Sequence, residues 1–179
     1  PTRRSSDLGD ALAYEEYGRN HRFVFATKNI ENLKGIPEED WQYGENASWL
    51  YYLFPNVQLG GGGHDANLIK IYPDPKNPGR SITKVNHYFS QEFIDYVSQV
   101  PDDGKSAYDK DRNPSLDGVV EVFDTTIEQE DYLMGETTQK SAETGIVKEF
   151  IFGRNEPALH HYHNTFREAL NLPPLEKVG

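Results

Sequence analysis

An acidic residue interrupts the hydrophobic face of the longest helix that this sequence predicts. Residues 119–141 are amphipathic, and their apolar residues recur at steps of three, four or seven: Val119, Phe123, Ile127 and Met134. Asp131 shares this face, four residues after Ile127. Because a carboxylate buried without a partner is costly, we expect Asp131 to meet a cation, a hydrogen-bond network or a metal ion. Gly135, one turn further on, leaves space beside it. The alternative is a helix rotated by one residue, with the carboxylate in solvent.

Composition restricts the classes of partner and of site. The chain has 179 residues, 36% of them hydrophobic, which is enough for one domain with a core. Its formal net charge of -11 argues against nucleic acid or an anionic membrane as partner, and no apolar run is long enough to span a bilayer. Cysteine is absent, which excludes disulfides and thiolate-held clusters within this chain. A cytoplasmic location is therefore expected.

The first eight residues, PTRRSSDL, resemble the translation of a sequencing-adapter oligonucleotide. We expect residues 1–8 to carry neither fold nor function. Natural sequence is then expected to begin near Gly9, inside a longer gene.

Periodicity and turn residues predict consecutive strands followed by long helices. The predicted strands are residues 21–26, 48–59, 66–72 and 81–89, with a strand-like piece at 148–153. The predicted helices are 91–100, 119–141 and 155–172, and residues 36–41 are expected to form a turn that opens a short helix. Pro55 is expected at a strand edge or bulge, Gly60–Gly63 in a flexible hairpin loop and 102–118 in an exposed loop. This order predicts an α+β fold in which helices cover one face of an antiparallel sheet.

The histidines invite a metal interpretation that their spacing does not favour. His160 and His163 lie three residues apart on one face of the last helix, but the general-base glutamate of an HExxH motif is missing. We interpret them as surface or boundary residues. His21, His64 and His87 are isolated in the sequence and are expected to be structural or exposed.

Three segments together resemble a known family. They are WLYYLFPN, followed by a glycine-rich turn and a strand ending in Tyr-Pro; then EDYLMGETTQ; then GRNEPALHHYHNTFREAL. In this order they resemble the C-terminal catalytic part of the large (alpha) subunit of Rieske-type ring-hydroxylating oxygenases. The resemblance extends from about residue 14 to 175.

The resemblance implies a helix-grip (START-like) fold, in which a curved antiparallel sheet wraps around a long helix. It also implies a mononuclear non-haem Fe(II) held by two histidines and one aspartate, with open positions for O2. Asp131 precedes Glu136-Thr137-Thr138-Gln139 and so occupies the place of the family's aspartate ligand. Asp124 and Glu130 fit both the helix face and the motif less well.

The substrate implied is a small organic, aromatic molecule that is hydroxylated or dihydroxylated. Phe123 and Ile127 share the face of Asp131 and are candidate substrate-binding residues, although plain core positions are an equal alternative. Asn56, in the Phe-Pro-Asn segment, is a weaker candidate. The identity of the substrate is not encoded in any recognisable pattern.

The resemblance further implies an electron supply and an assembly. A Rieske [2Fe–2S] cluster would feed electrons to the iron, with a ferredoxin or reductase as donor, in a trimeric ring that can include a beta subunit. Neither the cluster's cysteines nor the family's His-x4-His pair occurs in this sequence. We therefore expect residues 9–179 to be a partial catalytic domain, inactive alone, whose missing ligands lie upstream.

Two other function classes compete with the oxygenase. A stand-alone helix-grip module that binds an apolar ligand would explain the fold, but not a carboxylate on the cavity helix. A structural partner, such as a beta subunit, would not explain the acidic helix or the GRNEPALHHYH ending.

Overall fold

The computed structural model describes residues 11–41 and 46–177, and the chain divides into two compact units. The first unit combines Pro1–Tyr88 with Phe152–Gly179, and the second is Phe89–Ile151. An antiparallel sheet followed by helices makes the fold α+β, as the sequence predicts, and is consistent with the helix-grip expectation. The adapter-like residues 1–8 lie outside the described residues.

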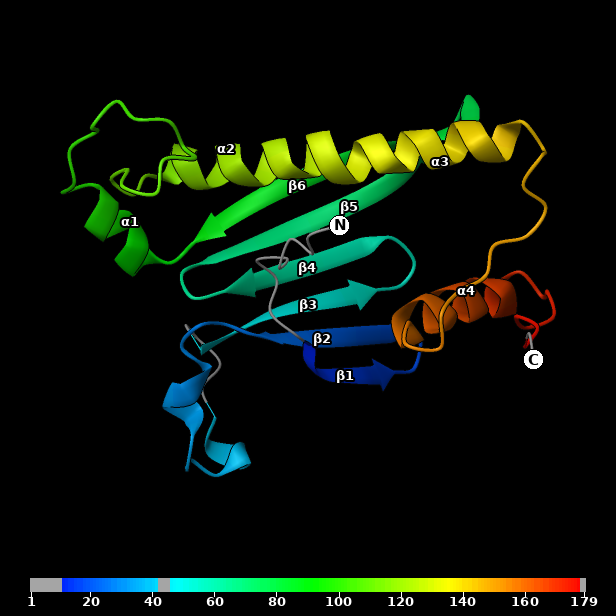
Figure 1. Ribbon diagram of the computed structural model, residues 1–179, viewed down its shortest axis with the longest axis horizontal. Coiled ribbons are helices and arrows are strands. Elements are labelled where there is room, and N and C mark those ends of the chain that lie inside the picture. The colour runs from blue at the N-terminus through cyan, green and yellow to red at the C-terminus, as the bar shows by residue number, and fades with distance from the viewer. Residues whose placement is uncertain (1–10, 42–45, 178–179) are drawn as a thin grey trace, which may run out of the picture. The chain divides into compact units, whose positions relative to one another are not determined.

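The first unit is built on a six-stranded sheet whose strands lie in sequence order (Figure 1). The strands are β1 (Ala11–Tyr17), β2 (Asn20–Ala26), β3 (Ala47–Leu53), β4 (Val57–Gly62), β5 (Asp65–Asp74) and β6 (Asn77–Phe89). Gly18 has a φ of 60° in the two-residue turn between β1 and β2, a conformation that glycine adopts without steric cost. The sequence did not predict β1, because its alanines and glutamates are poor strand formers, so pairing with β2 decides its structure.

The predicted strand 48–59 is wrong as a single element. It is a hairpin, in which β3 and β4 are joined by a turn that contains a cis peptide bond between Phe54 and Pro55. Asn56 ties this turn to β5 through two hydrogen bonds. Its Nδ2 donates to the carbonyl of Ile71 at 2.9 Å, and its own carbonyl accepts from the Ile71 amide at 3.0 Å.

The glycine run was also predicted wrongly as a flexible loop. Gly60, Gly61 and Gly62 belong to β4; Gly60 and Gly61 pair with both neighbouring strands, and Gly62 pairs with Asp65 of β5. A Cβ at Gly61 would lie 2.8 Å from Cζ2 of Trp49 and 2.9 Å from the carbonyl oxygen of Asp65. The close packing of the tryptophan ring therefore explains why glycine stands inside a strand here.

The helix α4 (Pro157–Ala169) packs on one face of the sheet, which we call the α4 face. Ring pairs join helix and sheet, with centroid distances of 4.9 Å for Tyr52–Tyr162, 5.1 Å for Phe54–Phe166 and 5.1 Å for His21–His161. The buried hydrophobic residues are Val24, Leu33, Ala47, Tyr52 and Ile69, all in the first unit. Leu33 comes from η1 (Ile30–Leu33), which is followed by a second short 3-10 helix, η2 (Glu38–Asp40).

Only part of α4 is covered by the sheet. Tyr162 and Phe166 pack on the sheet, but Leu159 and Leu170 are exposed, and the most buried residue is Thr165. Glu156 occupies the N-cap position, and Pro157 is the first helical residue.

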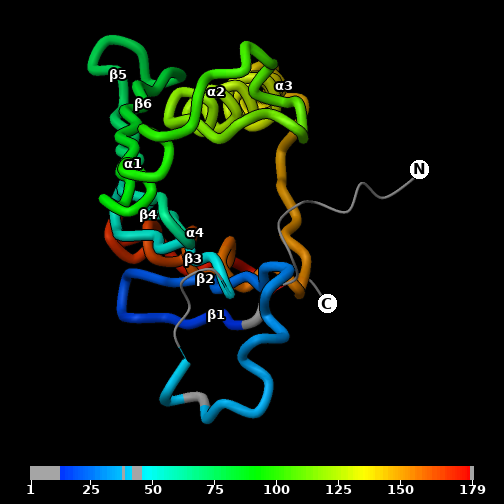
Figure 2. The backbone as a smooth tube through the Cα atoms, turned by 90° about the vertical axis from the view of Figure 1, so that its left-hand side faces the viewer, coloured from blue at the N-terminus to red at the C-terminus, as the bar shows by residue number. Residues whose placement is uncertain are grey.

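The second unit consists of helices and loops. They are α1 (Gln91–Val97), α2 (Leu116–Thr126), η4 (Ile127–Tyr132) and α3 (Leu133–Glu143). The helices α2, η4 and α3 follow one another without a break, so residues 116–143 form one continuous helix, which we call the rod. Figure 2 shows α2 and α3 nearly end-on, one behind the other. The strand-like piece at 148–153 has no regular structure, so that prediction was wrong. Among the described residues, no helix combines the length and apolar character that crossing a bilayer requires.

Candidate functional site

The rod that carries Asp131 begins at a well-defined cap. The Oγ of Ser115 accepts a hydrogen bond from the amide of Gly118 at 3.1 Å, which satisfies one of the free donors of the first turn. A Cβ at Gly118 would lie 2.9 Å from Nη1 of Arg112, so glycine lets the arginine cover the helix start. The helix therefore starts at Leu116, three residues before the predicted start at 119.

Asp131 lies in η4, a π-helical segment inside the rod. In a π-helix the hydrogen bonds run from residue i to i+5, so each turn is wider than in an α-helix. Such segments are uncommon and occur frequently at functional sites. The segment covers Ile127 as well, so two of the sequence-predicted site residues share it.

The side chain of Asp131 is exposed rather than buried. Phe123 and Ile127 are half-buried, whereas Met134 is 65% exposed, so the predicted buried stripe ends at η4. A π turn holds more residues than an α turn, so the residues after η4 are rotated relative to a regular α-helix, and Met134 need not share the face of Phe123 and Ile127. The orientation of Asp131 toward a cavity stays a prediction.

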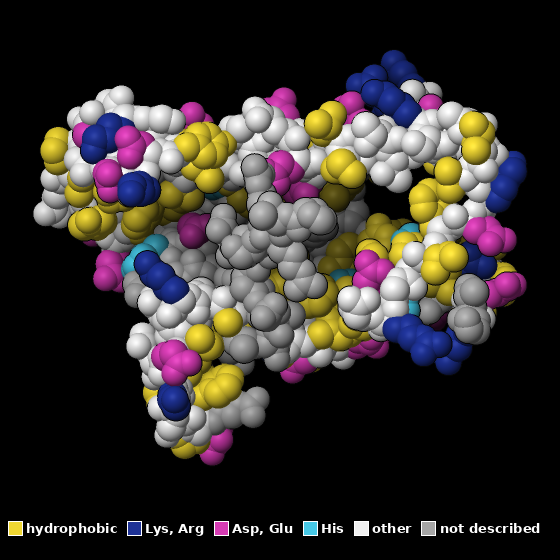
Figure 3. Space-filling view, in the orientation of Figure 1, with side chains coloured by type: hydrophobic (Ala, Val, Ile, Leu, Met, Phe, Trp, Pro, Cys, Tyr) yellow, Lys and Arg dark blue, Asp and Glu magenta, His cyan; other side chains and the backbone are white. Residues whose placement is uncertain are grey.

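The described residues leave the surroundings of Asp131 open. A Cβ at Gly135 would meet no atom of the described residues within 4 Å, which agrees with the space expected there. Within the same part of the chain, the carboxylate of Asp131 has no hydrogen bond or ion pair. Hydrophobic side chains lie on the surface of this rod, among them Tyr132, Leu133 and Met134 (Figure 3).

Asn56, the third predicted substrate-binding residue, has a structural use. Its side-chain Nδ2 donates to the carbonyl of Ile71 and holds the β3–β4 turn against β5. The amide nitrogen is thus committed to the backbone, and any substrate contact would fall to the amide oxygen.

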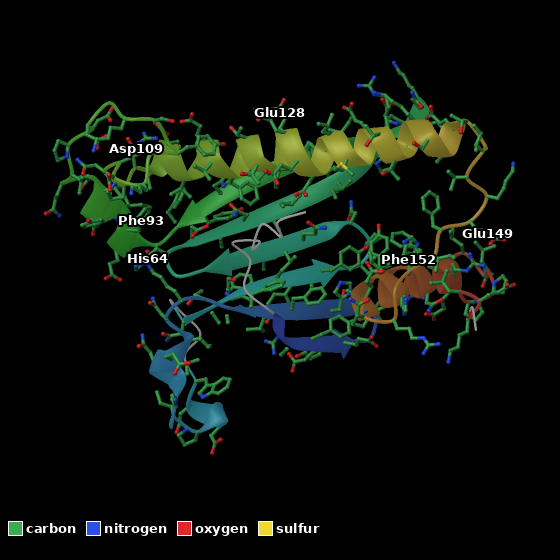
Figure 4. All side chains as sticks on the ribbon, viewed as in Figure 1. His64, Phe93, Asp109, Glu128, Glu149 and Phe152 are labelled. Atoms are coloured by element: carbon green, nitrogen blue, oxygen red, sulfur yellow. The ribbon has the colours of Figure 1, made fainter. Side chains whose placement is uncertain are left out.

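His21, His161 and His163 pack against other groups of the first unit. The ring of His163 stacks on Phe152 with centroids 4.6 Å apart, beside α4 (Figure 4). Nδ1 of His161 lies 3.0 Å from Nδ1 of His21, and its Nε2 lies 2.8 Å from the carbonyl oxygen of Gly18. Because a carbonyl only accepts, Nε2 of His161 carries the proton, and in the neutral pair Nδ1 of His21 donates to Nδ1 of His161. His21 is 6% exposed, which confirms its structural interpretation.

The described residues do not by themselves form a metal site. Nowhere in residues 11–41 and 46–177 do three histidine, aspartate or glutamate side chains lie close enough to hold an ion. Asp131 can supply one oxygen ligand, which is fewer than Fe(II) in a facial triad requires. No reaction step through iron can be derived from these residues alone.

A comparison with models of known protein families identifies the family of this chain. The family model described as the ring-hydroxylating alpha subunit (catalytic domain) matches residues 4–172. The chain belongs to this family. The match includes the Phe-Pro-Asn turn, η4 and α4, and it begins inside the adapter-like segment, whose origin stays a prediction. No curated protein and no solved structure matched the chain.

Membership in the ring-hydroxylating alpha-subunit family confirms the resemblance found in the sequence and the α+β fold. It assigns the chain to a family of ring-hydroxylating oxygenases, whose catalysis uses non-haem iron. It also favours the oxygenase over the stand-alone binding module and the structural subunit.

Two features escaped the sequence analysis. The contact of His21 with His161 joins residues 140 positions apart, and no local sequence pattern predicts it. Asn67 is buried near the start of β5, in phase with Ile69 on one face of the strand. The sequence did offer an indication for Asn67, because a polar residue there occupies the same face of the strand as its apolar neighbours.

Proposed function

We propose that this chain is the catalytic domain of a ring-hydroxylating oxygenase in which Asp131 is the carboxylate ligand of a mononuclear Fe(II). The observation that carries the proposal is the position of Asp131, in the π-helical segment η4 and within the family match. Iron(II) bound by two histidines and a carboxylate supplies O2 activation next to an organic substrate. The two histidines and the Rieske [2Fe–2S] cluster would come from residues beyond this sequence.

The chain's own residues have two tasks in this proposal. The rod holds Asp131 on a helix that is capped at Ser115, so the position of the carboxylate is set by a rigid element rather than by a loop. Phe123 and Ile127 would contribute apolar surface for a small, aromatic substrate. Electrons would arrive from a ferredoxin or reductase, and the subunits would assemble as a trimeric ring, with or without a beta subunit.

The proposal is tested in the complete alpha subunit by comparing Asp131→Ala with Glu130→Ala. Both residues are exposed acids in η4, so each variant removes one negative charge from the same short segment. We expect substrate-dependent O2 consumption to fall more than about a hundredfold in Asp131→Ala. Mutating even a residue that only supports a direct metal ligand lowers metal affinity or activity about ten- to a hundredfold. Glu130→Ala should keep most of the activity. Equal activity of the two variants would refute the assignment.

The isolated 179-residue chain offers an independent test. One carboxylate binds Fe(II) weakly, so we expect an anaerobic iron titration to show no tight stoichiometric binding and no oxygenase activity. Tight binding of a single iron by this polypeptide would contradict the expectation that its remaining ligands lie elsewhere.

A further inference from the structure

The strand register places one row of residues on the α4 face of the sheet. In an antiparallel sheet, directly paired residues point to the same side. His21 pairs with Tyr52, and both contact α4, which defines the face. On the same face, the next row runs across four strands: Phe23 pairs with Leu50, Leu50 with Gly60, and Gly60 with Asn67.

Asn67 ends this row with a polar group that lacks a partner. The residue is 9% exposed, and its Oδ1 is buried without a hydrogen bond to any residue in the described part of the chain. A buried acceptor left unpaired costs roughly 1–3 kcal/mol, and such groups in native proteins require an explanation. An apolar side chain of the same shape would avoid this cost. A contribution to stability is therefore a poor explanation for the side-chain amide of Asn67.

The neighbours of Asn67 on this face, across β4 and along β5, do not donate to its Oδ1. Gly60, directly opposite, has no side chain, and a Cβ there would lie 3.3 Å from Cδ1 of Leu50. Ile69, two residues along β5, is buried and apolar. Asp65, two residues in the other direction, carries a carboxyl group, and no hydrogen bond joins it to Oδ1 of Asn67. The row thus offers apolar surface with an acceptor at its end, which is the usual composition of a small-molecule site.

We propose that Asn67 is a specificity-determining residue, whose Oδ1 accepts a hydrogen bond from a hydroxyl or N–H group of the substrate. The apolar body of that substrate lies over Leu50 and Gly60. The inference rests on the proposed function and names its substrate class: a small ring compound that carries a hydrogen-bond donor, rather than a plain hydrocarbon. A site built to pair with a donor discriminates against analogues that lack it, because its own polar group is then left unpaired.

Three probes of similar size separate the chemical possibilities in the full 179-residue chain. Phenol carries a donor, anisole only an acceptor, and toluene neither. In ¹⁵N–¹H spectra, we expect phenol to shift the side-chain amide of Asn67 saturably, and to bind about tenfold more tightly than anisole or toluene. Equal affinities for the three probes, or no saturable shift at Asn67, would overturn the proposal.

The variant Asn67→Leu removes the acceptor and keeps the size of the side chain. We expect the phenol preference to disappear while the melting temperature stays the same or rises, because an unpaired buried amide is replaced by an apolar group. Asn86→Leu, at an exposed position of β6, is the matched control and should keep the preference. A clear fall in melting temperature for Asn67→Leu would show that the amide is structural and overturn the proposal.

The outcome is independent of the iron assignment. Probe binding needs neither iron nor O2. The phenol preference, tested with Asn67→Leu, and the iron ligand, tested with Asp131→Ala, can therefore be refuted separately. If Asp131→Ala remains active while the preference for phenol still depends on Asn67, the binding site is supported and the assignment of Asp131 as an iron ligand is wrong.

Discussion

Two long amphipathic helices in this chain differ in what their side chains contact. In α4, His161, Tyr162 and Phe166 meet rings of the sheet, and Thr165 is buried. In the rod, every side chain from Glu128 to Glu143 is exposed, and this stretch includes the family's acidic motif. The comparison separates the residues that pack against the sheet from the residues that we propose for chemistry. Stability measurements should therefore respond to α4 and its sheet partners, and chemical measurements to η4.

Removing a ring under α4 should have the largest effect on stability. Tyr52 is 7% exposed, stacks on His21 and contacts Tyr162, so Tyr52→Ala should lower the free energy of unfolding by about 3 kcal/mol. Urea denaturation measures this. Tyr108→Ala, at a position that is 56% exposed in the second unit, should change it by less than about 0.5 kcal/mol. Similar losses in both variants would break the comparison.

The His21–His161 contact should make the docking of α4 sensitive to acid. Burial, and then the nearby charge of His161, lower the pKa of His21, against a smaller opposing effect of Glu16. The unfolded chain takes up a proton near pH 6.5 that the folded chain takes up only at lower pH. The free energy of unfolding should therefore fall as the pH drops below about 6.5, and level off below the folded pKa.

His21→Gln should flatten this dependence, measured by urea denaturation between pH 7.5 and pH 5. The matched control is His160→Gln, on the same helix next to His161, with its ring near Phe152. If the control flattens the curve as much as His21→Gln does, the shared contact is not its origin.

Truncating apolar side chains of the rod should have the smallest effect on stability. Leu133 and Met134 are 55% and 65% exposed, so Leu133→Ala and Met134→Ala should each change the unfolding free energy by less than about 0.5 kcal/mol. Thermal and urea denaturation of the isolated chain test this. A loss comparable to that of Tyr52→Ala would mean that the rod is packed as firmly as α4.

The sequence predicted the element types better than their boundaries. The helices at α1, the rod and α4 and the strands β2, β5 and β6 follow from local periodicity, and the structure has all of them. Two errors have a common cause in packing between distant residues. Gly61 is held in a strand by Trp49 and Asp65, and β1 forms because β2 pairs with it. Neither contact can be inferred from the residues around the site.

The candidate site was predictable to a different degree. The motif after Asp131 identified the family, and the family match confirms it. The helical phase was not predictable, because a wheel of constant pitch fails across the π turn from Ile127 to Tyr132. Asn67 could be noticed as a polar residue in an apolar strand, but its unpaired oxygen appears only once the neighbouring strands are in register.

The most direct test of the central claim is the iron content of the complete alpha subunit. If Asp131 is the carboxylate ligand, Asp131→Ala purified anaerobically should lose the mononuclear iron and retain the iron of the Rieske cluster, while Glu130→Ala keeps both. If Asp131→Ala retains the full complement of iron, Asp131 is not a ligand and the proposed site is wrong.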